Sequence, residues 1–110
     1  MPKATGVSGR FYFKRTTNGN LIGEWSNDHS DGVFTESCDL VGDEIDWDWK
    51  SSEPVKFHST WQENGKPCFA ILEVKRKGKL FELEWRGKGN FDGDGMLCDD
   101  ILVGDYRSVP

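Results

Sequence analysis

Aromatic residues are the side chains in this sequence whose types and spacing best suit chemistry, because they recur at alternate positions of short runs. If they share one face of a sheet, they either fill a core or line a pocket for an apolar or flat ligand. Indole faces also attract cations, and the formal net charge of −5 would favour a cationic ligand. The candidate pocket-lining residues are Phe11, Phe13, Trp25, Trp47, Trp61, Trp85 and Tyr106.

Groups for acid–base or nucleophilic catalysis receive little support from the sequence. His29 lies in a polar loop, and His58 lies in a predicted strand on the face opposite to Phe57 and Ser59. No spacing brings a nucleophile within hydrogen-bond reach of either imidazole. The carboxylates of residues 44–48 alternate with tryptophans, which predicts that they are solvated. We predict no catalytic residues, and the sequence leaves an enzyme open without favouring one.

One acidic segment, residues 90–101, has part of the spacing of a calcium loop. It offers oxygen ligands at positions 1, 3 and 5 and glycine at position 6, but Ile101 stands at position 12, where a bidentate Glu should close the shell. Cys38, Cys68 and Cys98 are an odd number, with no CxxC pair and no histidine at metal-ligand spacing. We therefore predict no metal site, no cofactor and reduced, partly buried thiols.

Length and composition predict one compact domain. The 110 residues are 35% hydrophobic and 13% aromatic, enough for a core that needs no metal or disulfide. Residues 1–8 are expected to form a flexible arm and residues 9–110 a single β domain. The acidic balance argues against nucleic-acid and membrane partners. No signal-like or membrane-spanning apolar run is present, so we expect a cytoplasmic protein, and whether a signal peptide was removed is left open.

The charges are unevenly distributed along the chain. Residues 28–53 contain nine acidic residues against the single base Lys50, whereas residues 75–88 contain six basic residues against Glu82 and Glu84. These segments are either two solvated faces or surfaces that dock between copies of the chain or onto a protein partner. We expect a homo-oligomer.

Alternating runs separated by turn residues predict an all-β protein. The run 44–50 alternates Ile45, Trp47 and Trp49 with acids and is the clearest predicted strand. Short connections favour antiparallel neighbours, so we expect an eight-stranded up-and-down barrel, with a two-sheet β-sandwich as the alternative. Nine runs are candidates for these strands: 10–15, 21–26, 33–40, 44–50, 56–62, 68–75, 80–86, 91–97 and 101–107.

A weak internal repeat relates residues 21–49 to residues 81–106. A shift of 60 positions superposes the Glu-Trp pairs, and a shift of 57 superposes five identical residues and places Trp49 on Tyr106. The repeat predicts one unit used twice: a Trp-ended strand, a Gly turn, a strand from Phe to Leu, an Asp turn and an aromatic-ended strand. The identities pair Gly32 with Gly89, Phe34 with Phe91, Leu40 with Leu97, Asp43 with Asp100 and Asp48 with Asp105.

The C-terminal half carries the motif Gly-x-Phe-x-Gly-x-Gly-Met-Leu-x-x-Asp-x-Leu-x-x-x-Tyr, which runs from Gly89 to Tyr106. The run Ser59-Thr60-Trp61 is similar to a Gly-Thr-Trp opening, with Ser in place of Gly. Over residues 57–107 the chain resembles small lipocalin-like and avidin-like barrel proteins of bacteria, and it is also similar to orphan proteins carried on mobile gene cassettes. The resemblance implies an up-and-down barrel, whereas ligands vary across such families.

These patterns predict a non-catalytic binding module that holds a small, partly apolar or cationic ligand inside the barrel. The alternative is a non-catalytic interaction protein with a packed core, whose outer faces form a homo-oligomer or bind a protein partner. An empty cavity between Trp61, Trp85 and Tyr106 would favour the first function. A large apolar area buried between subunits, with residues 75–88 against the acidic segment, would favour the second.

Overall fold

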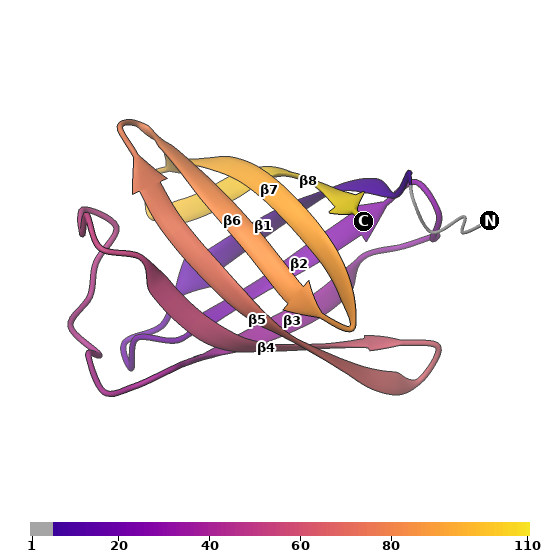
Figure 1. Cartoon of the computed structure of the whole chain (residues 1–110), viewed down its shortest axis with the longest axis horizontal. Helices are drawn as coiled ribbons and strands as arrows, with labels where there is room; N and C mark the ends of the chain where they lie inside the picture. Colours follow the sequence, from indigo (N-terminus) through magenta and orange to yellow (C-terminus); the bar gives the residue numbers. More distant parts are fainter. Residues whose placement is uncertain (1–5) are drawn as a thin grey trace.

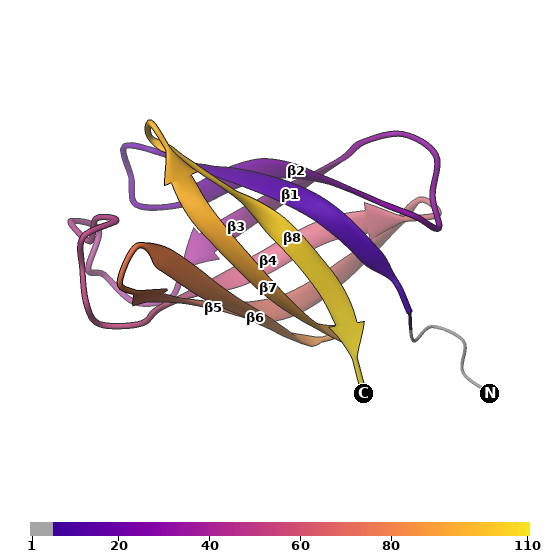
Figure 2. The ribbon, with the colours of Figure 1, turned by 90° about the horizontal axis from the view of Figure 1, so that it is seen from above.

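The strands form a closed barrel. The computed structural model describes residues 6–110, and its eight antiparallel strands each pair with the next along the chain. The last strand lies beside the first, as Figure 1 and Figure 2 show. Their pairing runs from Ser8↔Arg107 to Lys14↔Ile101. The prediction of an eight-stranded barrel is confirmed, and closure excludes the two-sheet alternative. The strands are β1 (Ser8–Arg15), β2 (Leu21–Asn27), β3 (Phe34–Leu40), β4 (Val55–Glu63), β5 (Lys66–Lys77), β6 (Leu80–Gly87), β7 (Gly89–Cys98) and β8 (Ile101–Val109).

Side chains alternate between the interior and the surface of the barrel, as the period of a strand requires. In β6, Phe81, Leu83 and Trp85 are buried, while Glu82 and Glu84 are exposed. The same alternation in the other strands produces one hydrophobic core inside the barrel. Its most completely buried side chains are those of Phe13, Phe57, Leu21, Leu72, Leu83, Leu102, Cys38 and Ser59.

The run 44–50 is not a strand, so this prediction is wrong. Residues 41–54 form a connection of turns and bends between β3 and β4. Asp48 Oδ1 accepts a hydrogen bond from the backbone N–H of Lys50 at 2.8 Å, and Ser51 Oγ accepts one from that of Asp48 at 3.2 Å. Such local acceptors compete with strand pairing. Because the barrel is closed without this segment, it also has no free strand edge to join.

The predicted repeat has a structural counterpart only in its first two strands. Trp25 lies opposite Phe34 across β2 and β3, and Trp85 lies opposite Phe91 across β6 and β7. The third predicted strand exists in the second copy, as β8, but its equivalent in the first copy belongs to the connection 41–54. The matching registers therefore describe two similar hairpins.

The barrel has two distinct ends, which lie at opposite sides of Figure 1. The open end carries both ends of the described chain, the β2–β3 loop 28–33, the β4–β5 turn and the β6–β7 turn. The capped end carries the β1–β2 turn, the β5–β6 and β7–β8 turns and the connection 41–54. The position of a residue along its strand therefore determines how far its side chain lies from each end of the barrel.

Two in-strand glycines sit where neighbouring strands approach too closely for a side chain. A Cβ atom at Gly23 would collide with the carbonyl oxygen of Tyr12, and one at Gly104 would collide with that of Asp94. Gly23 faces β1 and Gly104 faces β7, so both close contacts lie across paired strands. Glycine at these two positions therefore allows the paired strands to approach this closely.

The flexible arm predicted for residues 1–8 does not extend to Ser8. Residues 1–5 lie outside the described residues, whereas Ser8 already begins β1. Val7 is held to β8, because its N–H donates to Ser108 Oγ at 3.1 Å and its carbonyl accepts from Ser108 N–H at 2.9 Å. Across residues 6–110, no helix has the length and hydrophobicity needed to cross a membrane.

Candidate functional site

An aromatic cavity of about 130 Å³ opens at the open end of the barrel. The inward side chains of β1, β2, β4, β6, β7 and β8 each contribute one ring to its wall. Asn27, His29, Ser30, Glu36 and Glu63 supply its polar groups. We call this space the open-end cavity. Its aromatic lining consists of Phe11, Trp25, Trp61, Trp85, Phe91 and Tyr106.

The structure brings together five of the seven side chains that the sequence suggested as pocket lining: Phe11, Trp25, Trp61, Trp85 and Tyr106. The cavity thus lies between the three residues, Trp61, Trp85 and Tyr106, where an empty space was expected to favour ligand binding. Phe91 also lines the cavity, although it was not among the predicted lining residues; it begins the predicted strand 91–97.

Phe13 and Trp47 do not reach the open-end cavity. Phe13 is 1% exposed and packs deeper in the barrel, with its ring centroid 5.5 Å from that of Phe11. Trp47 lies at the capped end, where its Nε1 donates to the carbonyl oxygen of Gly19 at 2.7 Å. The guanidinium carbon of Arg15 lies 4.9 Å from the Trp47 ring centroid. Trp47 is therefore a packed cover for the interior at that end.

The rings of the cavity wall are held in place by one another. Trp85 contacts Phe11 edge-to-face at 5.6 Å and Tyr106 at 6.1 Å between ring centroids. Tyr106 contacts Phe91 edge-to-face at 5.7 Å, and its hydroxyl accepts a hydrogen bond from Asn27 Nδ2 at 3.1 Å. Burial raises the pKa of Tyr106 to about 12, so its hydroxyl is neutral at physiological pH.

A buried carboxyl group, that of Glu36, also lines the cavity, and it was not among the predicted site residues. Glu36 is 7% exposed and points into the barrel from β3. Its Oε2 accepts hydrogen bonds from Trp85 Nε1 at 2.8 Å, from Ser59 Oγ, and from Cys38 Sγ at 3.7 Å. Three strands, β3, β4 and β6, thus fix one oxygen of this carboxyl group.

The two carboxyl oxygens of Glu36 have different surroundings. Oε1 receives no hydrogen bond from residues 6–110. If it were also fully enclosed, it would be a buried polar atom without a partner, but among these residues only Trp25 Nε1 is such an atom. Oε1 is therefore not sealed in the core, and since Glu36 lines the cavity, this oxygen is the one that a ligand can reach. Burial raises the pKa of Glu36, while the donors from Ser59, Trp85 and Cys38 oppose that shift.

The cavity has a negative lining. Among the described residues that line it, Glu36 and Glu63 are the two carboxyl groups, and His29 is the one side chain that can carry a positive charge. Among the described residues that line the cavity, none is Lys or Arg. Glu63 Oε2 accepts a hydrogen bond from Cys68 Sγ at 3.3 Å. A cation entering this space would meet aromatic faces and carboxylates with no competing base except His29.

The buried thiol next to Glu36 is not suited to nucleophilic chemistry. Burial and the neighbouring Glu36 carboxyl raise the pKa of Cys38 well above its ordinary value, which keeps the group protonated. Cys38, Cys68 and Cys98 are free thiols, and Cys98 is exposed at the β7–β8 turn. His58 lies on the outer face of β4, away from the cavity.

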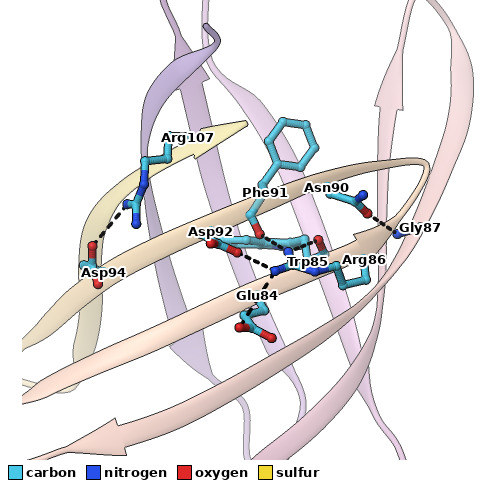
Figure 3. A network of polar contacts seen from close by, with 9 residues as sticks. All are labelled: Glu84, Trp85, Arg86, Gly87, Asn90, Phe91, Asp92, Asp94 and Arg107. Carbon is cyan, nitrogen blue, oxygen red and sulfur yellow. Dashed lines mark hydrogen bonds and ion pairs between the residues drawn. The ribbon is translucent and has the colours of Figure 1, made fainter. Parts of the chain in front are cut away.

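The segment 90–95 with partial calcium-loop spacing lies within β7, and its acids form ion pairs across strands. Asp92 accepts a hydrogen bond from Arg86 Nη2 at 2.7 Å, and Asp94 accepts one from Arg107 Nη1 at 3.2 Å (Figure 3). Arg86 also donates to the carbonyl oxygens of Trp85 and Phe91, both at 2.9 Å. In the part of the chain that is described, no three His, Cys, Asp or Glu side chains cluster as metal ligands would.

Comparison with known proteins adds no family to this description. The chain matches no protein-family model, no curated protein and no solved structure. The open-end cavity and its buried carboxyl group are therefore the features from which a function can be argued.

Proposed function

We propose that this protein is a non-catalytic binding module whose open-end cavity holds a small, partly apolar ligand. The observation that carries the proposal is a cavity lined by six aromatic side chains and a few polar groups, because binding sites for small molecules combine apolar walls with a small number of placed polar atoms. These six aromatic residues lie on six different strands, so the wall is part of the barrel itself. A preformed site of this kind loses little freedom when a ligand enters.

The size of the cavity limits the ligand. Its volume of about 130 Å³ is close to that of an apolar cavity of roughly 150 Å³ that binds benzene. Sites for drug-sized molecules are larger, about 300–1,000 Å³. We therefore expect a molecule of a few heavy atoms, or one end group of a longer molecule that protrudes between the β2–β3 loop and the β4–β5 turn.

Native mass spectrometry of the purified protein, followed by ligand-observed NMR with small neutral probes such as benzene and cyclohexanol, tests this proposal. Val7→Trp places a large ring at the wall of the cavity, and Val41→Trp makes the same change on an exposed position of the capped end. We expect probe binding by the wild type and by Val41→Trp and loss of binding by Val7→Trp. Circular dichroism establishes that both variants fold.

Two results would count against the binding module. Absence of any bound probe in the wild type would remove the proposal, and equal probe binding by Val7→Trp and Val41→Trp would move the site away from the open-end cavity. A small molecule retained in the native spectrum, by contrast, would identify the ligand by its mass and show it to be carried through purification.

A non-catalytic interaction protein that forms a homo-oligomer is the second candidate, and one surface feature favours it. Phe69 is 60% exposed on the outer face of β5, next to the partly exposed Ile71. Phe69→Ser, and separately the reversal of Lys75, Arg76, Lys77 and Lys79 to Glu, should dissociate an oligomer built on this region. Sedimentation velocity measures the outcome, and a wild type that sediments as a monomer would reject this candidate.

We also propose a cytoplasmic location and an origin among the lipocalin-like barrel proteins of bacteria. The three free thiols support a reducing environment, because structural disulfides are typical of oxidising compartments. The closed barrel supports the kinship at the level of architecture, which many unrelated proteins share. Fractionation of cells that produce the native protein tests its location.

A further inference from the structure

We propose that the ligand of the open-end cavity is a small organic cation with an alkylated ammonium group, held between aromatic faces with the carboxylate of Glu36 as its counter-charge. This inference rests on the proposed function and deepens it, because it assigns a charge and a chemical class to the ligand.

The wall of the cavity is rich in aromatic rings, which favours a cation. Three of its six rings are indoles, Trp25, Trp61 and Trp85, and indole is the aromatic side chain that attracts cations most strongly. Rings contributed from six strands surround the space on several sides, as in the aromatic cages that recognise quaternary ammonium groups. An aromatic cage of this type prefers a cation over a neutral group of the same shape.

The charge of the described cavity lining is negative, which also favours a cation. Glu36 and Glu63 line the cavity, and no Lys or Arg does so among its described lining residues. The neutral Tyr106 hydroxyl does not offset them. An anionic ligand would meet two carboxyl groups without a compensating base other than His29, so the lining disfavours anions. A buried charge is costly unless it is paired, and an incoming cation supplies that pair for Glu36.

Glu36 is fixed by hydrogen bonds to one of its two carboxyl oxygens. Ser59, Trp85 and Cys38 all donate to Oε2, which orients the carboxyl group and stabilises its ionised form. Oε1 remains without a protein donor among the described residues and is the oxygen available to the cavity. The protein thus positions one negative oxygen at the wall of an aromatic space and leaves its partner to come from outside.

The degree of alkylation follows from the rings of the wall, which pack better against alkyl groups than against N–H groups. A primary ammonium group needs up to three hydrogen-bond acceptors. Asn27 Oδ1 already accepts from the backbone N–H of His29 at 2.9 Å, and Glu63 Oε2 already accepts from Cys68 Sγ. An ammonium group with several alkyl substituents needs few acceptors or none and presents its methyl groups to the rings. The geometry therefore favours a tri- or tetra-alkylated ammonium.

A matched pair of ligands tests the inference on the wild-type protein. Choline and 3,3-dimethylbutan-1-ol have the same shape, but the first carries a quaternary nitrogen where the second carries a carbon atom. Isothermal titration calorimetry and ligand-observed NMR measure both. We expect choline to bind at least about tenfold more tightly, which corresponds to ~1.4 kcal/mol. Comparison of the two ligands needs no variant, so it does not depend on the folding of a mutant.

Glu36→Gln then tests the counter-charge, and Glu53→Gln is its control, since Glu53 is an exposed acid in the connection 41–54 and the net charge changes equally. We expect Glu36→Gln to weaken choline binding about tenfold or more and to leave the neutral alcohol unchanged. Glu53→Gln should bind both ligands as the wild type does. Equal losses in the two variants would overturn the role of Glu36.

A proton measurement gives a second readout. Because burial raises the pKa of Glu36, choline should bind more tightly as the pH rises through that value, with release of a proton below it. Calorimetry in two buffers of different ionisation enthalpy measures the release, and Glu36→Gln should abolish the part of it that comes from Glu36. The other titratable groups around the site, whose contributions remain in that variant, are Cys38, Glu63, Asp28, His29 and Tyr106.

The outcomes separate the two proposals. Equal or tighter binding of 3,3-dimethylbutan-1-ol overturns the cationic ligand and keeps a small-molecule site, whereas failure of choline, the alcohol, benzene and cyclohexanol alike overturns both proposals. If choline binds, competition by phosphatidylcholine vesicles assigns the alkylammonium group to a lipid headgroup. Lack of competition assigns it to a soluble molecule, and either result supports the inference.

Discussion

Both ends of the barrel place tryptophan over buried aromatic rings, but the polar groups around those rings are arranged differently. At the capped end, Trp47 donates to Gly19, lies under the guanidinium of Arg15 and contacts Trp49 and Phe57 edge-to-face. At the open end, three tryptophans surround a cavity of about 130 Å³. There Trp25 Nε1 has no hydrogen-bond partner among residues 6–110, and Glu36 carries a buried carboxyl group.

This difference shows how the same residue type completes a packed core at one end and borders a cavity at the other. A buried tryptophan whose N–H is paired and whose ring is surrounded on all sides contributes to stability. Rings that border an empty space give up part of their contacts, and a buried carboxyl group beside them lowers stability further. The capped end thus resembles a completed core, whereas the open end keeps unmet interactions that a ligand can complete.

Substitution of glycine at each end is expected to give the largest contrast. Gly19 and Gly32 both have positive φ, of 80° and 94°, so alanine meets a similar backbone cost of about 1–2 kcal/mol at either position. A Cβ atom at Gly19 would also lie 2.9 Å from the carbonyl oxygen of Ile45, whereas one at Gly32 meets nothing within 4 Å. Gly19→Ala should therefore cost about 1–3 kcal/mol more than Gly32→Ala.

Urea denaturation of the two glycine variants measures this difference, with the wild type as reference. Similar losses of unfolding free energy in the two variants would show that the connection 41–54 can shift to make room for the added methyl group. The capped end would then not be the more rigidly packed end of the barrel.

Much of the fold that carries this contrast could be predicted from the sequence, and the missing part has a physical reason. Alternation of Phe81, Leu83 and Trp85 with acids predicted strands and their buried faces, because a strand has a fixed period of two. The same pattern in residues 44–50 predicted a strand that does not exist, because alternation also suits a connection whose tryptophans pack onto a barrel end. Strand period is local, whereas closure of the sheet by β8 on β1 is not.

The buried carboxyl group was within reach of the sequence but was not identified. Phe34, Glu36, Cys38 and Leu40 alternate along one predicted strand, so Glu36 shares the face of apolar residues. Its partners Ser59 and Trp85 come from two other strands, 23 and 49 positions away in the chain. Sequence alternation can therefore place such a group inside, but only the register of the strands shows which donors stabilise it.

Removal of single indole N–H groups is the next contrast. Trp47→Phe leaves the carbonyl oxygen of Gly19 without its donor, whereas Trp25→Phe removes an N–H that has no partner. Both changes remove a similar ring volume. We expect Trp47→Phe to cost about 1–3 kcal/mol more than Trp25→Phe, because a buried polar group without a partner is costly. Thermal and urea denaturation measure both values, and a larger loss from Trp25→Phe would contradict this account of the two ends.

Glu36→Gln is expected to change stability by about 1 kcal/mol, with a sign that depends on pH. The carboxyl pKa is raised in the folded protein, so between the ordinary Glu value and that raised value folding takes up a proton. Wild-type stability linked to Glu36 is complete below this window and is lost as the pH rises through it. The stability of Glu36→Gln relative to the wild type should therefore increase with pH across the window.

Melting curves of the wild type and Glu36→Gln across this pH range, without added ligand, give the difference in stability directly. Titration of surface acids cancels in that difference, because both proteins contain them. A constant difference at every pH would mean that the carboxyl group ionises in the folded protein as it does in the unfolded chain, and the open end would then hold no unmet charge.

The smallest effects are expected on the outside of the barrel, where both ends use ion pairs. Arg86, towards the open end, binds Asp92 and two carbonyl oxygens, whereas Lys77, near the capped end, forms a single pair with Glu82 at 3.5 Å. Exposed pairs contribute about 0.2–1 kcal/mol. Arg86→Met should cost up to about 1 kcal/mol and Lys77→Met less than about 0.5 kcal/mol, measured by urea denaturation at low and high salt. A salt-independent loss of several kcal/mol from either variant would mean that the outer wall contributes to the difference between the ends, which we otherwise assign to the interior.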